Sequence, residues 1–178
     1  MLLGGETAEF GLTGAMAASG TSGASAMLTI KNILCPVDFS PPSLQALAYG
    51  KELAAKLGAD VTVLHAYQVP SYVVPNGSFT PTVELSAELR KVAREQLDAL
   101  IEDVADEGPT IKTVLVEGLP HREIRRASED ADLIVMGTHG RTGLAHLLLG
   151  SVAERVMRTC DVPIVTVQEL LDAGVHFG

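Results

Sequence analysis

The chain has 178 residues, of which 47% are hydrophobic and 20% charged, and its formal net charge is −9. This length suits one globular domain with a core large enough to fold without disulfides or a structural metal, which excludes fibrous and disulfide-stapled classes. The 13 Lys and Arg are outnumbered by 22 Asp and Glu, and no basic block interrupts this balance. We therefore expect no nucleic-acid binding.

The cysteines and the lack of targeting signals bear on location. Cys35 and Cys160 lie far apart beside apolar runs, which is typical of buried, reduced thiols. No stretch approaches the ~18 to 20 consecutive apolar residues of a membrane span. The first residues also lack the Lys- or Arg-headed apolar core of a signal peptide. We expect a cytoplasmic protein with no membrane attachment.

Residues 1–26 differ in composition from the remainder of the chain. They contain six Gly among many Ala, Ser and Thr, and they have no hydrophobic period that a fold could bury. We interpret them as a flexible leader, either an appended segment or a natural disordered tail, and place the start of the folded domain at Met27.

Five short apolar runs follow, at residues 33–37, 61–66, 111–116, 133–136 and 164–167. They are rich in Val and Ile and show no polar alternation, which is typical of strands covered on both faces in a parallel sheet.

Helical patterns separate these runs. The first lies between Ser40 and Gly58, with a mostly apolar stripe formed by Leu44, Leu47, Ala48, Lys51, Ala55 and Leu57. Three more patterns cover residues 83–106, 120–130 and 151–159. The β-α alternation requires right-handed crossovers, so it predicts a single open, doubly wound α/β sheet with helices on both faces. Residues 68–82 are rich in Pro and Gly and predict a loop, long enough to be a lid.

The segment "GTHGRTGLAHLLLGS", residues 137–151, follows the fourth predicted strand. Gly137 and Gly140 permit positive φ angles, through which successive N–H groups can form an anion-binding nest. Gly150 and Ser151 open the last helix, whose unpaired N–H groups and dipole attract a phosphate, and the Ser151 hydroxyl could cap the helix or touch that phosphate. An ordinary glycine-rich turn before a capped helix is the alternative.

Position favours a ligand site. In open α/β sheets, ligands lie outside the carboxyl ends of the strands, and both the glycine segment and Asp38 follow such ends. Asp38 could accept a hydrogen bond from a ribose or base, or help hold a cation; alternatively, it is a helix N-terminal charge near Ser40. The chain has no GxxxxGK(S/T), no GxGxxG after the first strand, no HExxH, no CxxC and no GxSxG. These absences argue against P-loop NTPases, ordinary dinucleotide enzymes, zinc sites and acyl transfer.

Gly137, Gly140, Gly150 and Ser151 match the pattern G-x2-G-x9-G-S/T. On this pattern the chain, over about Met27 to Gln168, resembles the ATP-binding branch of the universal stress protein family. The resemblance implies one domain at residues 27–168, followed by a tail at 169–178. It also implies five parallel strands in the order 3-2-1-4-5, the adenine nucleotide alpha hydrolase-like fold.

The same resemblance implies a ligand and its contacts. ATP would be bound, with Mg²⁺ or Mn²⁺ carried by its phosphates and no metal-ligating residue assigned. Pro36, Val37 and Asp38 would border the adenine and ribose, Ala66 would line the adenine pocket, and Val116 and Gly118 would lie beside the nucleotide. The ribose and phosphates would be held by Met136, Gly137, Gly140, Arg141, Gly150, Ser151 and Val152.

The resemblance further implies a nucleotide-dependent stress-response and signalling module with weak or no ATP hydrolysis and no assigned catalytic residue. It implies a homodimer paired through Pro163 to Val167, and an apolar edge strand independently needs a partner or cover, although the tail could supply that cover. Two alternatives stay open. One is a slow Mg-dependent ATPase using Asp38 and Arg141 in part, and the other is a nucleotide-independent dimeric interaction scaffold.

Overall fold

The computed structural model of the protein describes residues 29–70, 72–74, 77–79, 82–104, 108–138 and 149–167. The predicted leader at 1–26 and tail at 169–178 lie outside these residues, as does most of the glycine-rich segment. None of the helices in these ranges is long and apolar enough to cross a membrane.

Five parallel strands form the main sheet. They are β1 (Asn32–Pro36), β2 (Asp60–Tyr67), β5 (Ile111–Glu117), β6 (Leu133–Gly137) and β7 (Ile164–Val167), in the spatial order β5-β2-β1-β6-β7. β1 is central, with Ile33 opposite both Val61 of β2 and Leu133 of β6. Among these five strands this is the order 3-2-1-4-5, so the predicted fold class is confirmed.

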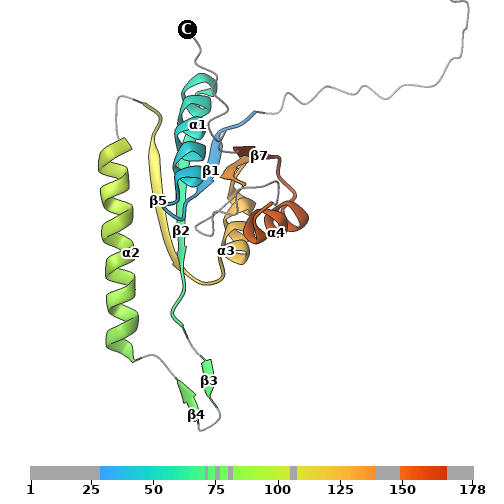
Figure 1. Ribbon diagram of the computed structural model, residues 1–178. Helices are drawn as coiled ribbons and strands as arrows, with labels where there is room; N and C mark the ends of the chain where they lie inside the picture. The colour runs from blue at the N-terminus through green and yellow to red at the C-terminus, as the bar shows by residue number, and fades with distance from the viewer. Residues whose placement is uncertain are drawn as a thin grey trace, which may run out of the picture.

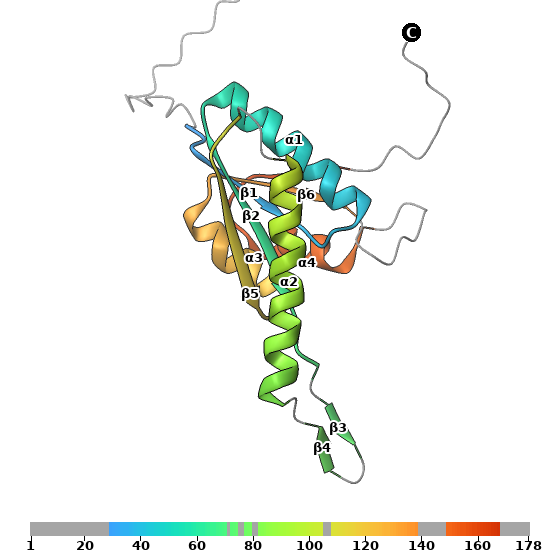
Figure 2. The ribbon, with the colours of Figure 1, turned by 90° about the vertical axis from the view of Figure 1, so that its left-hand side faces the viewer.

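Helices cover both faces of the sheet, as Figure 1 shows from one side. α1 (Pro41–Leu57) and α2 (Val83–Val104) lie in front of it in Figure 2, and α3 (Pro120–Ala127) and α4 (Ser151–Thr159) lie behind. A 3-10 turn, η1 (Ser128–Asp130), ends α3. Alternate β1 residues enter the two cores: Ile33 and Cys35 join the α1 side, and Leu34 joins the α3–α4 side. The continuous apolar strands follow from this double burial.

α1 packs closely on the sheet through small residues, and of the stripe predicted to face the sheet only Leu47 is buried. The helix buries Ala46, Leu47, Gly50 and Ala54, together with its first-turn residues Pro42 and Ser43. By contrast, Leu44 and Leu57 are 37% and 46% exposed. A Cβ at Gly50 would lie 2.5 Å from the Cys35 sulfur, so large side chains have no room at this interface. Burial also raises the pKa of the Cys35 thiol to about 12.

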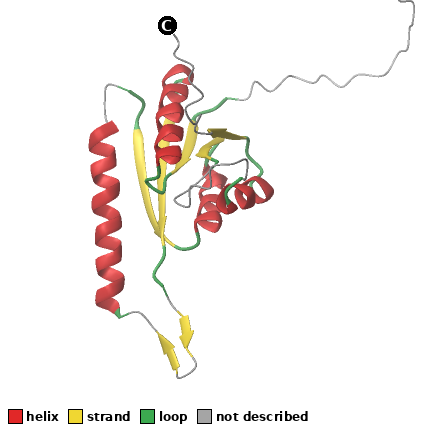
Figure 3. Ribbon diagram, in the orientation of Figure 1, coloured by secondary structure: helices red, strands yellow, loops and turns green. Residues whose placement is uncertain are grey.

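α2 is longer but less buried, with only Ala93 and Leu97 fully enclosed. Its first turns extend beyond the sheet (Figure 1), beside a small hairpin that Figure 3 shows as strands separate from the main sheet. This hairpin, β3 (Tyr72–Val74) and β4 (Gly77–Phe79), is antiparallel and falls within the segment predicted as a loop. Strands of three residues are too short for a period to be recognised in the sequence, which explains the error.

Candidate functional site

A cavity of about 690 Å³ lies at the carboxyl ends of β1, β2 and β6. One wall comes from α2, and the opposite wall comes from the first residues of α3 and α4. Nine of the residues predicted for the site line this space: Pro36, Val37, Asp38, Ala66, Met136, Gly137, Gly150, Ser151 and Val152. The volume falls within the range of about 300–1,000 Å³ that is typical of small-molecule sites.

Four predicted residues are not among the described residues of this lining, two of them because they lie outside the described part of the chain. Val116 pairs with Ala66 across the β2–β5 ladder and packs into the α3–α4 core. The Gly118 N–H donates to the Tyr67 carbonyl oxygen at 2.9 Å, so Gly118 also lies beside β2 at the same end of the sheet. Gly140 and Arg141 lie outside the described residues.

Asp38 has the helix-start role that was one of its two predicted alternatives, and it also lines the cavity. Its Oδ1 accepts hydrogen bonds from the Ser40 N–H at 3.1 Å and from the Ser40 hydroxyl. Its own N–H donates to the Ser43 hydroxyl oxygen at 3.3 Å, and that hydroxyl donates to the Ser40 carbonyl oxygen at 2.9 Å. Asp38 therefore organises the start of α1 while it lines the cavity. A carboxylate held in this way is oriented before any ligand arrives.

The turn after β1 is shaped by Phe39 and His65. Phe39 has a φ of 64°, a left-handed conformation that is uncommon for a residue with a side chain. Its ring lies on the His65 ring, with centroids 4.4 Å apart. His65 Nδ1 lies 2.8 Å from the Val37 carbonyl oxygen, and His65 is buried in the cavity wall. These contacts fix the turn that presents Asp38.

Gly137 is required for close approach and not for the left-handed backbone that we predicted. Among the described glycines only Gly58 and Gly118 have positive φ angles, and Gly137 closes β6 in extended conformation. A Cβ on Gly137 would lie 2.9 Å from the Pro42 carbonyl carbon and 3.0 Å from its oxygen. The absence of a side chain therefore lets the end of β6 touch the first turn of α1.

The start of α4 faces the cavity. The Gly150 N–H donates to the Thr138 carbonyl oxygen at 2.8 Å, which joins the two ends of the glycine-rich segment. Gly150 is the N-cap, and no side chain caps the helix, so the capping role suggested for Ser151 was wrong. The first N–H groups of a helix have no partner within it. At α4 these groups belong to residues that line the cavity, Ser151 to Ala153.

Charge in the described part of the lining is sparse. Asp38 is its one carboxylate, and it contains no Lys or Arg. An anion would therefore be held mainly by backbone N–H groups and the dipole of α4. No group of three or more His, Cys, Asp or Glu that could hold a metal ion occurs among the residues that the structure describes. A cation would need ligands from the bound molecule itself.

The prediction missed several lining residues. On β1–β2 and α1 these are Ser43, Leu64, His65, Tyr67 and Gln68; on α2 they are Leu89, Val92, Ala93 and Gln96; on the other elements they are Pro120, Ile124, Thr138 and Ala153. His65 and Thr138 directly adjoin predicted residues, which was the available signal. No signal in the sequence marked the lining residues of α2, because their distance from the strand ends depends on how the helix packs.

Comparisons with known proteins agree with this architecture. A family model described as the universal stress protein family matches residues 29–168. Universal stress protein MJ0531 of Methanocaldococcus jannaschii is 38% identical over 144 residues, which cover 78% of this chain and 82% of that protein. Universal stress protein MJ0577 of the same organism is 31% identical over 153 residues, covering 78% and 94%.

Solved structures share the fold. The structure of MJ0577 superposes with a TM-score of 0.65 at 30% identity, covering 79% of this chain and 96% of that one. A universal stress protein solved in complex with cAMP superposes with a TM-score of 0.50 at 24% identity, which shows the fold alone. The sheet order and the cavity at its carboxyl edge define a doubly wound α/β protein. The chain belongs to the universal stress protein family.

Proposed function

We propose that this protein binds ATP and acts as a nucleotide-dependent stress-response and signalling module. The observation that carries the proposal is the cavity in which Asp38 and the first N–H groups of α4 face one space. A protein of the same fold has been solved with cAMP, which supports the idea that such a fold holds an adenine nucleotide.

The two ends of the cavity suit the two ends of a nucleotide. Apolar residues from β1 and β2, including Val37 and Ala66, suit an adenine ring, and the Asp38 carboxylate can accept hydrogen bonds from ribose hydroxyls. The N–H groups of Ser151 and Val152 suit phosphate oxygens. We propose that Gly140 and Arg141, from the segment that joins Thr138 to Leu149, complete the phosphate wall.

The donor set is compatible with Mg²⁺ or Mn²⁺ only if the phosphates supply most of its ligands, because Asp38 is the one carboxylate in the described lining. When bound, the cation would neutralise phosphate charge. Asp38 is also the one described carboxylate that could orient an attacking water, and its Oδ1 already accepts from Ser40. We therefore propose weak or no hydrolysis.

Ser151→Asp tests the site without weakening the fold. Ser151 is exposed at the first position of α4, where a negative charge interacts favourably with the helix dipole and stabilises the helix. A carboxylate at this position would nevertheless repel a phosphate. In calorimetric titrations of nucleotide-free protein with ATP and Mg²⁺, we expect saturable binding near one site per chain. AMP and GTP serve as comparators. Ser151→Asp should lose about tenfold or more in affinity, a change of about 1.4 kcal/mol or more.

The matched control is Ser151→Asn, which is similar in size and uncharged and should bind ATP nearly as well as the unaltered protein. Thermal unfolding without nucleotide should show Ser151→Asp to be at least as stable as that control. Equal ATP affinity in the Asp and Asn variants would contradict the phosphate position. No heat with the unaltered protein at millimolar ATP would refute the proposed function.

We also propose a homodimer formed through β7 and a cytoplasmic location. Val165 and Val167 pack with the α1 core and Ile164 packs with the α3–α4 core, so this edge strand is apolar on both faces. The Pro163 carbonyl oxygen accepts from the Ile134 N–H of β6, and the Val167 carbonyl oxygen accepts from the Thr138 N–H just after β6. Because backbone groups alternate in direction along a strand, the N–H and C=O groups of residues 164 and 166 point away from β6.

Thr166→Pro therefore removes an outward N–H donor without removing a bond to β6. Light scattering at micromolar concentration should give a dimer mass for the unaltered protein and for the control Thr166→Val, and a monomer mass for Thr166→Pro. A monomeric unaltered protein would refute the dimer.

A further inference from the structure

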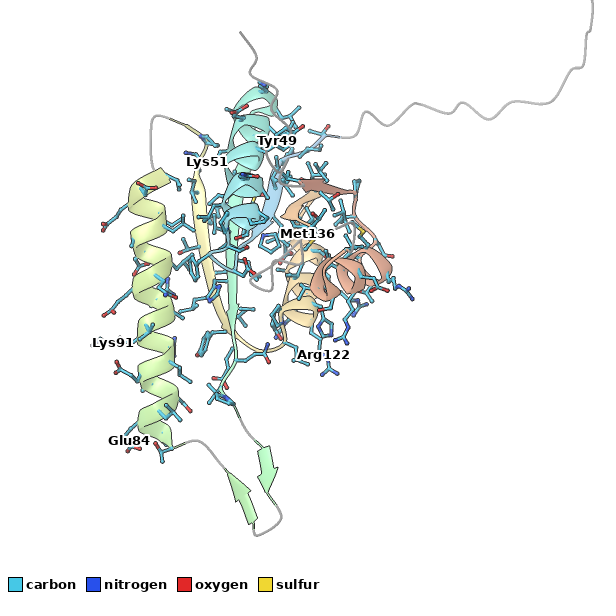
Figure 4. All side chains as sticks on the ribbon, viewed as in Figure 1. Tyr49, Lys51, Glu84, Lys91, Arg122 and Met136 are labelled. Atoms are coloured by element: carbon cyan, nitrogen blue, oxygen red, sulfur yellow. The ribbon has the colours of Figure 1, made fainter. Side chains whose placement is uncertain are left out.

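α3 and α4 carry a concentration of arginine on their outer side. Arg122, Arg125 and Arg126 lie on α3, and Arg155 and Arg158 lie on α4. These are five of the 13 Lys and Arg in the chain, all five are exposed, and neither helix contains a lysine. We call them the arginine surface. Figure 4 shows Arg122 pointing away from the sheet.

The two helices are joined, so the arginine surface is continuous. The Arg125 Nε donates to the Thr159 carbonyl oxygen at 3.1 Å, which links α3 to the last turn of α4. Partial burial of His121, together with the positive charges of Arg155 and Arg122, lowers the pKa of that imidazole. The positive charges of Arg122 on α3 and Arg155 on α4 therefore both act on the His121 imidazole.

Most of this positive charge is not neutralised locally. Arg158 pairs with Glu154 at 2.8 Å, an exposed contact within one helix. Among the residues that the structure describes, no carboxylate pairs with the side chains of Arg122, Arg126 or Arg155.

Two of the three basic residues of α2, Lys91 and Arg94, form a contrast within the same molecule. Lys91 pairs with Glu95 at 3.9 Å, and Arg94 pairs with Asp98 at 3.6 Å, each one helical turn away. On α2 each of these two cations has a paired carboxylate, whereas three arginines of the arginine surface pair with no carboxylate of the described residues. An acidic group from outside the chain could supply the negative charge that pairs with these arginines.

We infer that the arginine surface docks an acidic, Asp- and Glu-rich segment of a partner protein. The guanidinium group binds carboxylates through two parallel hydrogen bonds, which a lysine cannot do, and the surface is built from arginine alone. None of the five arginines lines the cavity, so the inference does not depend on ATP binding.

The size of the arginine surface favours a short segment over a long polyanion. α3 and α4 have 8 and 9 residues, so each is about 12 to 14 Å long. Glu129 and Asp130 limit the surface at the end of α3, and Asp161 follows α4. A nucleic-acid duplex or an anionic membrane would extend past these carboxylates over a chain with a net charge of −9, and would be repelled.

A labelled poly-glutamate peptide is the probe, and fluorescence anisotropy measures its binding to the full chain. The test variant is Arg122→Glu with Arg155→Glu, and the matched control is Lys91→Glu with Arg94→Glu. Both pairs change the net charge equally; Arg122, Arg155 and Lys91 are exposed and Arg94 is half-buried, so thermal unfolding checks that both variants fold. We expect saturable binding that weakens with salt, a loss of about tenfold or more in the test variant, and affinity within about twofold of the unaltered protein in the control.

Several outcomes would overturn the inference. Equal losses in the two variants would show that overall charge, and not this surface, governs binding. Absence of peptide binding at low salt would refute it directly. Tighter binding of a single-stranded RNA or of phosphatidylserine vesicles at the same salt concentration would assign the surface to another class of partner. Low-salt self-association that the Arg122→Glu/Arg155→Glu variant abolishes would make a second copy of this chain the occupant.

Discussion

α1 and α2 cover the same face of the sheet but are held there in different ways. α1 has 17 residues and buries six of them, most of which are small. α2 has 22 residues and buries two, Ala93 and Leu97. Lys51 of α1 donates to the Val104 carbonyl oxygen, so α2 is tied to α1 at its last turn, while its first turns extend beyond the sheet.

This difference bears on the cavity, which α1 lines with Ser43 and α2 lines with Leu89, Val92, Ala93 and Gln96. Where α1 meets the sheet, Gly50 lies against Cys35 and Gly137 lies against Pro42, with no room for an added carbon atom. On the α2 side, the wall includes Val92, which is 42% exposed. Segments with few buried contacts open at lower free energy than tightly packed ones. We therefore expect the strand ends beneath α1 to be the fixed part of the cavity and the α2 wall to be the adaptable part.

The largest effect that tests this comparison is expected from Gly50→Val. The new side chain would overlap the Cys35 sulfur and lie against Val135, so it should lower the free energy of unfolding by about 3 kcal/mol. Urea denaturation measures this change. Ala48→Val, an exposed position on the same helix, should change it by less than about 0.5 kcal/mol. A Gly50→Val protein of unaltered stability would remove the basis for calling α1 tightly packed.

A smaller effect on the free energy of unfolding is expected at Asp132, which lies beside the start of β1. The Asp132 Oδ2 accepts the N–H groups of Lys31 at 2.8 Å and Asn32 at 3.0 Å, and these bonds lower the pKa of Asp132. Because the pKa is lower in the folded protein, this stabilisation is complete above the ordinary pKa of aspartate. It is lost as the pH falls through the lowered value.

Asp132→Ala should therefore lower the free energy of unfolding by about 1 kcal/mol at neutral pH. The difference from the unaltered protein should shrink in acid, as followed by urea denaturation over a pH series. A difference that stays constant with pH would mean that the ionised carboxylate contributes nothing at this position.

The smallest effect is expected on the outer face of α2. Lys91 and Glu95 are each 64% exposed and 3.9 Å apart, so Lys91→Ala should change the free energy of unfolding by less than about 0.5 kcal/mol. Leu97→Ala, at a fully buried position of the same helix, should cost about 3 kcal/mol. Similar costs for the two variants would show that α2 is anchored along its whole length and would erase the contrast with α1.

The strands could be predicted because double burial leaves a continuous apolar run, as in residues 33–37 and 133–136. The buried face of α1 could not be predicted from the sequence. Ala46, Gly50 and Ala54 give little hydrophobic signal, and they are buried because the helix lies close to the sheet. Sequence reasoning looks for large apolar residues, and at this interface the large ones, such as Leu44, point outward.

The same division applies to the cavity. Asp38 and Gly137 could be predicted as lining residues because their positions follow directly from where strands end. Gln96 could not, because its place depends on the angle at which α2 crosses the sheet. The physical role of Gly137 was also hidden, since its closeness to Pro42 is a contact between segments far apart in the chain.

The position of β1 between β2 and β6 has a consequence for folding. β1 pairs with β2 soon after it in the chain, whereas the Asn32 N–H reaches Asp132 across 100 residues. Closing such a long loop costs more entropy than closing a short one, and contacts of large sequence separation slow folding. The cavity needs both pairings, since its walls come from β1, β2 and β6. A molecule bound there would therefore stabilise only chains in which β1 has paired with both β2 and β6, and its binding would report that the centre of the sheet has formed.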